Sequence, residues 1–162
     1  MTFYENGEQP KMFNLEKTRA QGQVKLQLIS PEGTIKDEQV VSNLVVDTGL
    51  DYIASRMKDA SATAMSHMEV GTDNTAAAAG NTALGAAISA SRVALTSTTV
   101  TSNAIEYIGD FPAGTGTGAI VEAGVLNASS GGTLLCRTVF SVVNKGADDT
   151  LKITWTVTVS DT

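Results

Sequence analysis

The sequence contains few of the residues that most often carry chemistry. Its 162 residues include one cysteine, Cys136, one histidine, His67, and one tryptophan. A single cysteine excludes an intrachain disulfide and gives no reason to expect an oxidising compartment. A zinc site would have to be completed by carboxylates, because only one histidine and one cysteine are present. No apolar run in the sequence is long enough to span a membrane. The first residues also lack the apolar run of a secretion signal, so we expect synthesis in a cytoplasm.

Charge is scarce as well. Only 17% of the residues are charged, against about a quarter in typical domains, and the formal net charge is −6. Binding to a nucleic-acid backbone requires clustered Lys and Arg, which are scattered here, so we expect no nucleic-acid partner. Thr, Ser, Ala and Gly take the place of charges. Such a surface suits close contact with neighbouring proteins, and it equally suits a simple robust domain.

The clearest pattern present is β-alternation. In residues 151–160 (LKITWTVTVS) every odd position is apolar and every even position is polar, which is the period of a half-buried strand. Each apolar side chain stabilises the fold by about 1.5–3 kcal/mol when fully buried. Strand patterns also cover 24–29, 35–41, 65–70, 92–101, 104–111, 120–126 and 133–144. In the last of these, Leu134, Cys136, Phe140 and Val142 are predicted to lie on one face, with Cys136 as a buried thiol. Eight short strands separated by Gly-rich turns predict an all-β fold, an antiparallel jelly-roll-like β-sandwich.

Two segments interrupt the strands. A short helix is predicted after the first hairpin, with Asp47 or Thr48 as its cap. Residues 72–90 are rich in Ala, Gly, Thr and Asn, and we interpret them as a long loop that lies over a neighbouring surface. The residues expected to form the buried face of the helix are Leu50, Ile53, Ala54 and Met57.

The chain divides into an arm and one domain. Residues 1–21 are polar and lack a sustained period, and we predict an extended N-terminal arm there, followed by a sandwich domain over 22–162. The arm is either a disordered tail or a segment that a partner orders. The residues that would bind that partner are Phe3, Tyr4, Met12 and Phe13.

Carboxylates are the one candidate for catalysis. Glu106, Asp110 and Glu122 lie on neighbouring predicted strands and could form the acid pair of a glycoside hydrolase. Glu106 and Asp110 fall on the face opposite Ile105 and Tyr107, however, where solvent is the simpler environment. An enzyme using Glu106 or Glu122 therefore stays a minor hypothesis.

The other candidates have simpler structural interpretations. His67 alternates with methionines, which is typical of a half-buried strand residue with a satisfied ring. The glycines of 114–118 resemble a phosphate loop only superficially, because the Walker lysine is missing. Trp155 lies on the core-facing register of the last strand, so it is expected to be buried. We therefore assign no catalytic, cofactor-binding or metal-binding residue.

Three blocks, 41–57, 68–84 and 118–160, resemble a diverse family of small tailed-phage virion proteins. The family pattern is a helix entry, a Gly-Thr strand end, a Glu-x-Gly strand, an Arg-x-x-Phe strand and a closing Ile-Thr-Trp strand. The residues that match are Asn43, Gly49 and Leu50; Gly71 and Thr72; Thr82 and Leu84; Glu122 and Gly124; Gly132 and Thr133; Arg137, Phe140 and Lys145; and Ile153, Thr154 and Trp155. The arm is not covered.

The resemblance implies a jelly-roll fold and a non-enzymatic structural role. We expect a capsid cement or decoration protein that bridges and stabilises major capsid protein subunits on the outer surface of the virion. Its expected partners are the major capsid protein and further copies of itself, as a dimer or trimer, with no cofactor and no membrane partner. The alternative is a tail or baseplate component with a receptor- or glycan-binding role.

Overall fold

Antiparallel strands form two layers in this protein. The computed structural model describes residues 18–58 and 62–161, and within these ranges the chain forms nine strands and one helix. The elements are β1 (Thr18–Ile29), β2 (Ile35–Val45), α1 (Asp47–Lys58), β3 (His67–Gly71), β4 (Val93–Ala94), β5 (Ser97–Thr101), β6 (Ala104–Phe111), β7 (Gly118–Leu126), β8 (Leu134–Lys145) and β9 (Thr150–Asp161).

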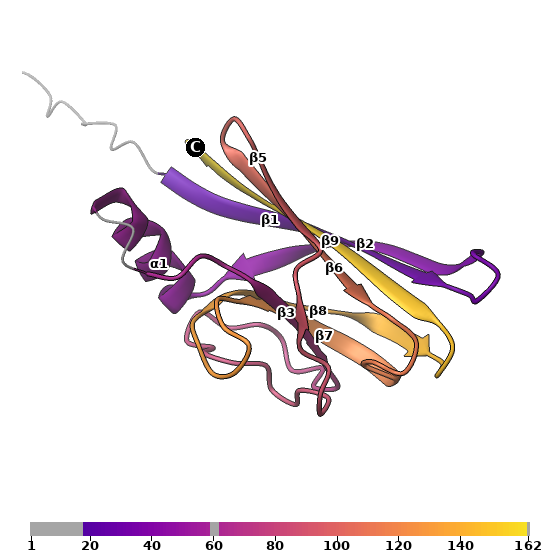
Figure 1. Ribbon diagram of the computed structural model, residues 1–162. Coiled ribbons are helices and arrows are strands. Elements are labelled where there is room, and N and C mark those ends of the chain that lie inside the picture. The colour runs from indigo at the N-terminus through magenta and orange to yellow at the C-terminus, as the bar shows by residue number, and fades with distance from the viewer. Residues whose placement is uncertain (1–17, 59–61, 162) are drawn as a thin grey trace, which may run out of the picture.

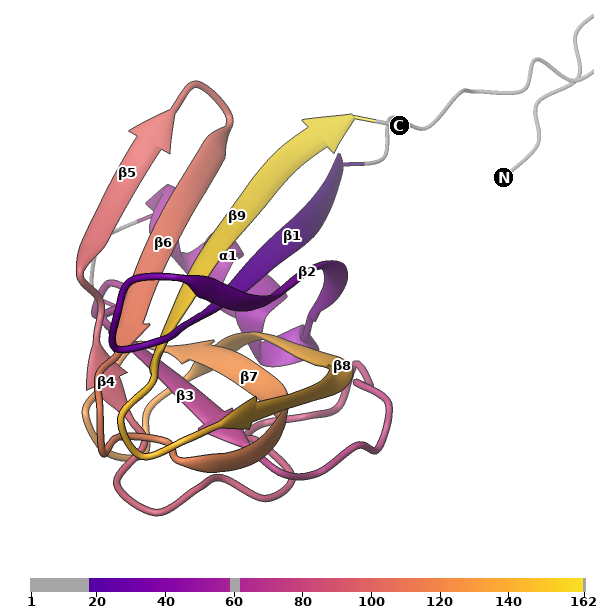
Figure 2. The ribbon, with the colours of Figure 1, turned by 90° about the vertical axis from the view of Figure 1, so that its right-hand side faces the viewer.

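Strand β2 joins the two layers. The hydrogen-bonded order is β4-β3-β7-β8-β2-β1-β9-β6-β5. Most of β2 pairs with β1, whereas its last residues, Leu44 and Val45, pair with β8. We call the layer β1, β2, β9, β6 and β5 the first layer, and the layer β8, β7, β3 and β4 the second layer; they diverge toward α1 (Figures 1 and 2). The predicted all-β, jelly-roll-like sandwich with one short helix is confirmed.

The first and last strands pair along their whole length. The register of β1 and β9 runs from Thr18 opposite Asp161 to Ile29 opposite Thr150. Residues 18–21, which the sequence placed in the arm, are therefore the first residues of the sheet. The start of the sandwich domain moves from residue 22 to Thr18, and residues 1–17 lie outside the described part of the chain.

The core lies between the layers. Leu151, Ile153, Trp155 and Val157 of β9 are all buried, which confirms the alternation predicted for this strand. They pack in one cluster with residues of both layers, including Phe111. Burial of these apolar side chains is the main stabilising contribution, as expected for a sandwich.

The predicted strand over 92–101 is in fact two strands. β4 pairs with β3 in the second layer, and β5 pairs with β6 in the first layer. Between them, the Leu95 amide donates to Ser66 and the Thr96 amide donates to Ile108. The chain crosses from one layer to the other at these two residues, a tertiary feature that the local pattern does not contain.

An irregularity in β8 changes which residues face the core. The sequence placed Val142 on the same face as Phe140, but Val142 is 47% exposed and Val143 is buried. The register with β7 shifts between Ile120, opposite Val143, and Glu122, opposite Val139. Such a bulge breaks the period of two, so the alternation predicted beyond Phe140 was wrong.

Helix α1 packs against β8 through a glycine. A Cβ atom on Gly49 would lie only 2.0 Å from the carbonyl oxygen of Leu135, so the helix approaches as closely as a backbone allows. Tyr52 and Ile53 pack against the core, whereas Leu50, Ala54 and Met57 are exposed, and the predicted helix face was wrong at these three positions.

The predicted helix cap is also used differently. Thr48 Oγ1 donates to the Leu134 carbonyl at 2.9 Å, so this hydroxyl attaches the helix to β8. Asp47 is the first helical residue, where a negative charge interacts favourably with the helix dipole.

Candidate functional site

The three candidate catalytic carboxylates do not form one site. Glu106 and Asp110 are half-buried on β6 in the first layer, and Asp110 accepts a hydrogen bond of 2.7 Å from Thr96 Oγ1. Glu122 lies on β7 in the second layer and is fully buried. The sequence-based prediction grouped Glu122 with the other two carboxylates because strands that follow each other in the sequence were expected to be neighbours in the sheet.

Glu122 is the centre of a buried ionic network. Its Oε2 atom accepts a hydrogen bond of 2.8 Å from Arg137 Nε, and both side chains are almost completely inaccessible. Backbone amides of the long loop complete the network: Gly85 and Ala86 donate to the two oxygens at 3.0 and 2.7 Å, and Asp73 donates at 3.3 Å. Charge-assisted bonds to all these donors satisfy the carboxylate. Its role in the described structure is to attach the loop to β7.

Arg137 binds the same loop from β8. It donates to Asn81 Oδ1 at 3.2 Å and lies 3.6 Å from the carboxylate of Asp73. The Thr75 amide and side chain, followed by the charge of Arg137, lower the pKa of Asp73. Glu122 and Arg137 thus hold residues 72–90 over the outer face of the second layer, at the bottom of Figure 2.

The loop also brings a small apolar cluster to that face. Leu84 packs with Val46, Leu126 and Leu134. The long loop predicted over 72–90 is confirmed, but sequence reasoning missed its apolar packing on the second layer. The available signal was the run of consecutive apolar residues Leu134, Leu135 and Cys136, and in the structure every residue from Leu134 to Thr138 is buried.

The remaining polar candidates have structural partners. His67 is half-buried, and its Nδ1 lies 2.8 Å from Ser66 Oγ, so the prediction of a satisfied strand histidine is confirmed. Cys136 is buried as predicted, and its burial raises the pKa of the thiol, with Asn43 acting in the opposite direction. Lys145 is buried and donates to the Pro112 carbonyl at 3.0 Å. Burial lowers its pKa, and the charge of Asp149 counteracts this shift.

Within residues 18–58 and 62–161 no three His, Cys, Asp or Glu side chains are grouped so that they could hold a metal ion. In the same part of the chain, no helix is long and apolar enough to cross a membrane.

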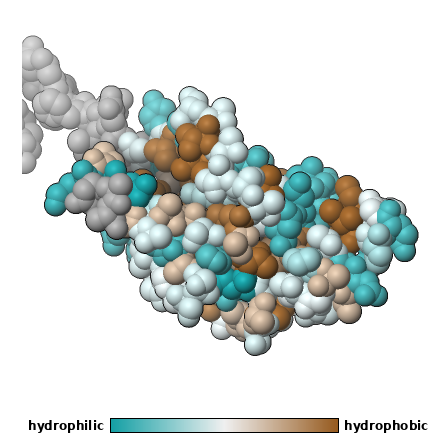
Figure 3. All heavy atoms as spheres, viewed as in Figure 1, coloured by the Kyte–Doolittle hydropathy of each residue, from teal (hydrophilic) through white to brown (hydrophobic). Residues whose placement is uncertain are grey.

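An apolar groove lies where the two layers diverge. It has a volume of about 460 Å³ and runs between α1 and the upper ends of β5, β6 and β9. In Figure 3, hydrophobic residues gather beneath the tip of the β5–β6 hairpin, toward α1. Residues that line the groove include Tyr52 and Ile53 from α1 and Val100, Ile105 and Val159 from the strands. We call this feature the α1–β5 groove.

The α1–β5 groove is mostly apolar and partly exposed. Val100 pairs with Ile105 across β5 and β6, so the two side chains lie on the same face of the sheet. Val100 is nevertheless 67% exposed. Among the described residues that line the groove, Arg56 is the one charged side chain. Burial raises the pKa of Tyr107 at its base, so this phenol stays neutral. An apolar depression of this kind offers area to an apolar side chain.

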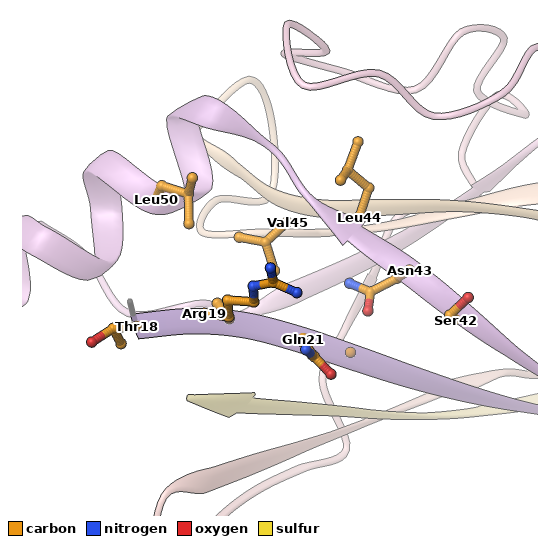
Figure 4. Close-up of a pocket in the computed structure, with 10 residues that line it drawn as sticks. Thr18, Arg19, Gln21, Ser42, Asn43, Leu44, Val45 and Leu50 are labelled. Atoms are coloured by element: carbon orange, nitrogen blue, oxygen red, sulfur yellow. The ribbon is translucent and has the colours of Figure 1, made fainter. Parts of the chain in front are cut away.

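A second hollow lies where β1 and β2 separate (Figure 4). It has a volume of about 470 Å³. Residues that line it are Arg19 and Gln21 of β1, Asn43 and Val45 of β2, and Leu50 of α1. Because β2 turns away to pair with β8, residues 18–21 pair with β9 but not with β2. Among the described residues, the start of β1 therefore has no strand partner on the side of β2.

The arm residues predicted to bind a partner, Phe3, Tyr4, Met12 and Phe13, lie outside the described residues. Comparisons with known proteins found no matching family model, no matching curated sequence and no matching solved structure. The similarity to tailed-phage virion proteins stays a prediction from the sequence.

Proposed function

We propose that this protein is a non-enzymatic structural component of a virion. In this proposal it is a cement or decoration protein that bridges and stabilises major capsid protein subunits on the outer shell. It is made in the host cytoplasm and binds both the major capsid protein and copies of itself, as a dimer or trimer.

The positions of the residues that carry the family resemblance are the main support. Gly49 lets α1 approach β8, Glu122 and Arg137 hold the long loop, and Trp155 fills the core. Each of these residues builds the body, and none of them lines the α1–β5 groove. A pattern shared among structural proteins is expected to specify a scaffold in this way, whereas a pattern shared among enzymes is expected to include reacting groups.

The surface is also suited to adhesion. β5 is an edge strand of sequence STTVT, exposed at all five positions and without charge or proline. Natural proteins usually protect such edges, and an unprotected edge can accept a strand from another chain. Thr18, the first residue of β1, lies close to the α1–β5 groove, and the sequence that precedes it contains the large apolar residues Met12 and Phe13.

The alternative is a tail or baseplate component that binds a receptor or glycan. It would have the same fold and the same family resemblance, so the body does not distinguish the two roles. The number of copies per particle does: cement requires hundreds, whereas a tail part requires a few to a few dozen. Quantitative mass spectrometry of purified virions against an isotope-labelled standard measures this number.

The direct test is binding to shells that lack the protein. We expect the full chain to co-sediment with such capsids and to raise their resistance to heat or low ionic strength. A chain without residues 1–17 should keep its fold, measured by circular dichroism, and lose shell binding. A deletion of the whole predicted arm, residues 1–21, would also remove the start of β1, so the deletion ends before Thr18. Unchanged binding of the folded deletion variant, or a low copy number, would contradict the cement proposal.

A further inference from the structure

The start of the described chain lies beside the α1–β5 groove. Ala20 of β1 pairs with Val159 of β9, and Val159 lines the groove. Neighbouring strands are about 4.8 Å apart, and Thr18 lies two residues, or roughly 7 Å, beyond Ala20. The point at which residues 1–17 join the body is therefore within roughly 10 Å of the groove wall.

The segment that precedes Thr18 contains side chains suited to this groove. Met12 and Phe13 are adjacent and large, and they are preceded by Phe3 and Tyr4. Phe13 is five residues before Thr18, so an extended chain reaches up to roughly 17 Å, which exceeds the distance to the groove. The reach is sufficient even when part of it is used in turning the chain back.

The groove provides matching chemistry. Val100 is largely exposed, and most residues that line the groove are apolar. The polar exceptions on the strand side are Thr98, Ser102 and Asn103, and Arg56 supplies the single charge among the described lining residues. An apolar patch of this kind on a protein surface usually marks a binding site. A segment tethered at such short range also has an effective concentration in the millimolar range, which favours it over a free partner of equal affinity.

We propose that the α1–β5 groove is the docking site of Met12 and Phe13 from the same chain. The docking is intramolecular and does not depend on the proposed virion function. A second copy, or another protein, is the competing occupant.

Hydrogen exchange of the full chain, read by mass spectrometry, tests this docking. We expect amides of α1 and of the β5–β6 hairpin to exchange at least about tenfold faster in the M12S/F13S variant than in the wild type. An E8S variant changes the arm without removing an apolar anchor and should exchange as the wild type does. Equal rates in the wild type and M12S/F13S would overturn the proposal.

A second pair of variants changes the groove itself. V100N removes an apolar wall residue, whereas T99N changes the neighbouring exposed residue on the opposite face of β5. V100N should release the arm, measured as faster exchange of residues 10–16, and T99N should not. Equal arm exchange in V100N, T99N and the wild type would overturn the proposal.

Dilution distinguishes the occupants. Docking within one chain predicts protection that is the same over a hundredfold range of protein concentration. Protection that falls on dilution would assign the groove to a second copy, and protection that appears only when capsids are added would assign it to the shell. Either outcome would overturn intramolecular docking, and neither depends on whether the cement proposal holds.

Discussion

At the scale of single residues, the pair formed by Glu122 and Arg137 is the most informative feature. Both side chains are buried at 2.8 Å from each other, and together they contact the backbone of residues 72–90. Burying two charges is costly, and it is offset only when every hydrogen-bonding position is used. The loop amides supply those bonds, so the ion pair and the loop depend on each other.

Replacing Glu122 with Gln tests this dependence. The amide keeps the shape of the side chain but leaves Arg137 without its closest carboxylate, so we expect a loss of about 3–5 kcal/mol in the free energy of unfolding. The matched control is E106Q on β6, which changes a half-buried carboxylate of the first layer and should shift stability by no more than about 0.5 kcal/mol. Chemical denaturation measures both. Similar small losses in the two variants would show that the network is not structurally important.

At the scale of elements, the contact between α1 and β8 shows how the helix is positioned. The helix has little buried apolar surface of its own, because Leu50 and Met57 are exposed. Its attachment relies on the close approach at Gly49, on the hydrogen bond from Thr48 to Leu134, and on the bond from the Val46 amide to Leu135 at 3.2 Å. A glycine in a helix usually costs about 1 kcal/mol relative to Ala, so its presence here reflects packing.

The substitution G49A separates helix propensity from packing. Propensity alone predicts a gain of about 1 kcal/mol, whereas the clash of the new Cβ with the Leu135 carbonyl predicts a loss of about 1–3 kcal/mol. We expect the loss, observed as a lower midpoint in urea. The control is G80A in the long loop, where a Cβ atom meets nothing within 4 Å. That variant should be neutral or slightly stabilising, and a stabilising G49A would contradict the packing argument.

At the scale of the whole molecule, the features that could be predicted from the sequence are those that depend on the pattern within one strand. The alternation in β9 and the burial of Trp155 follow from a period of two, and the sandwich follows from the succession of such strands. The buried Glu122 could not be predicted, because its partners Arg137, Gly85 and Ala86 are brought together only by the fold. The α1–β5 groove arises from the divergence of two layers, which no local pattern contains.

The same limit applies to the residues that join the layers. Asp149 is the last residue of the turn between β8 and β9, and its neighbours in the sequence do not indicate a distant partner. In the structure it is buried, accepts a bond of 2.7 Å from Lys36 Nζ at the start of β2, and accepts another from the Gly146 amide at 2.9 Å. It therefore links the β8–β9 turn to the opposite hairpin, and its contribution belongs to the stability of the molecule as a whole.

Acid should weaken this link. The hydrogen bond from Lys36, followed by that from Gly146, lowers the pKa of Asp149 in the folded protein. A carboxyl with a lower pKa in the folded than in the unfolded state stabilises the fold fully above its unfolded pKa of about 3.9, and this stabilisation is lost as the pH falls through the folded value. D149N should therefore be less stable than the wild type near about pH 7, and it should lose less stability on acidification to about pH 3.

Urea midpoints at the two pH values measure both effects. The control is D148N, since Asp148 is the exposed neighbour in the same turn and removing its charge leaves the bonds from Lys36 and Gly146 in place. Asp73 also has a lowered pKa, so D149N should reduce the acid sensitivity without abolishing it. If D149N and the wild type lost equal stability between the two pH values, the link from Lys36 to Asp149 would not contribute to holding the turn on the sandwich.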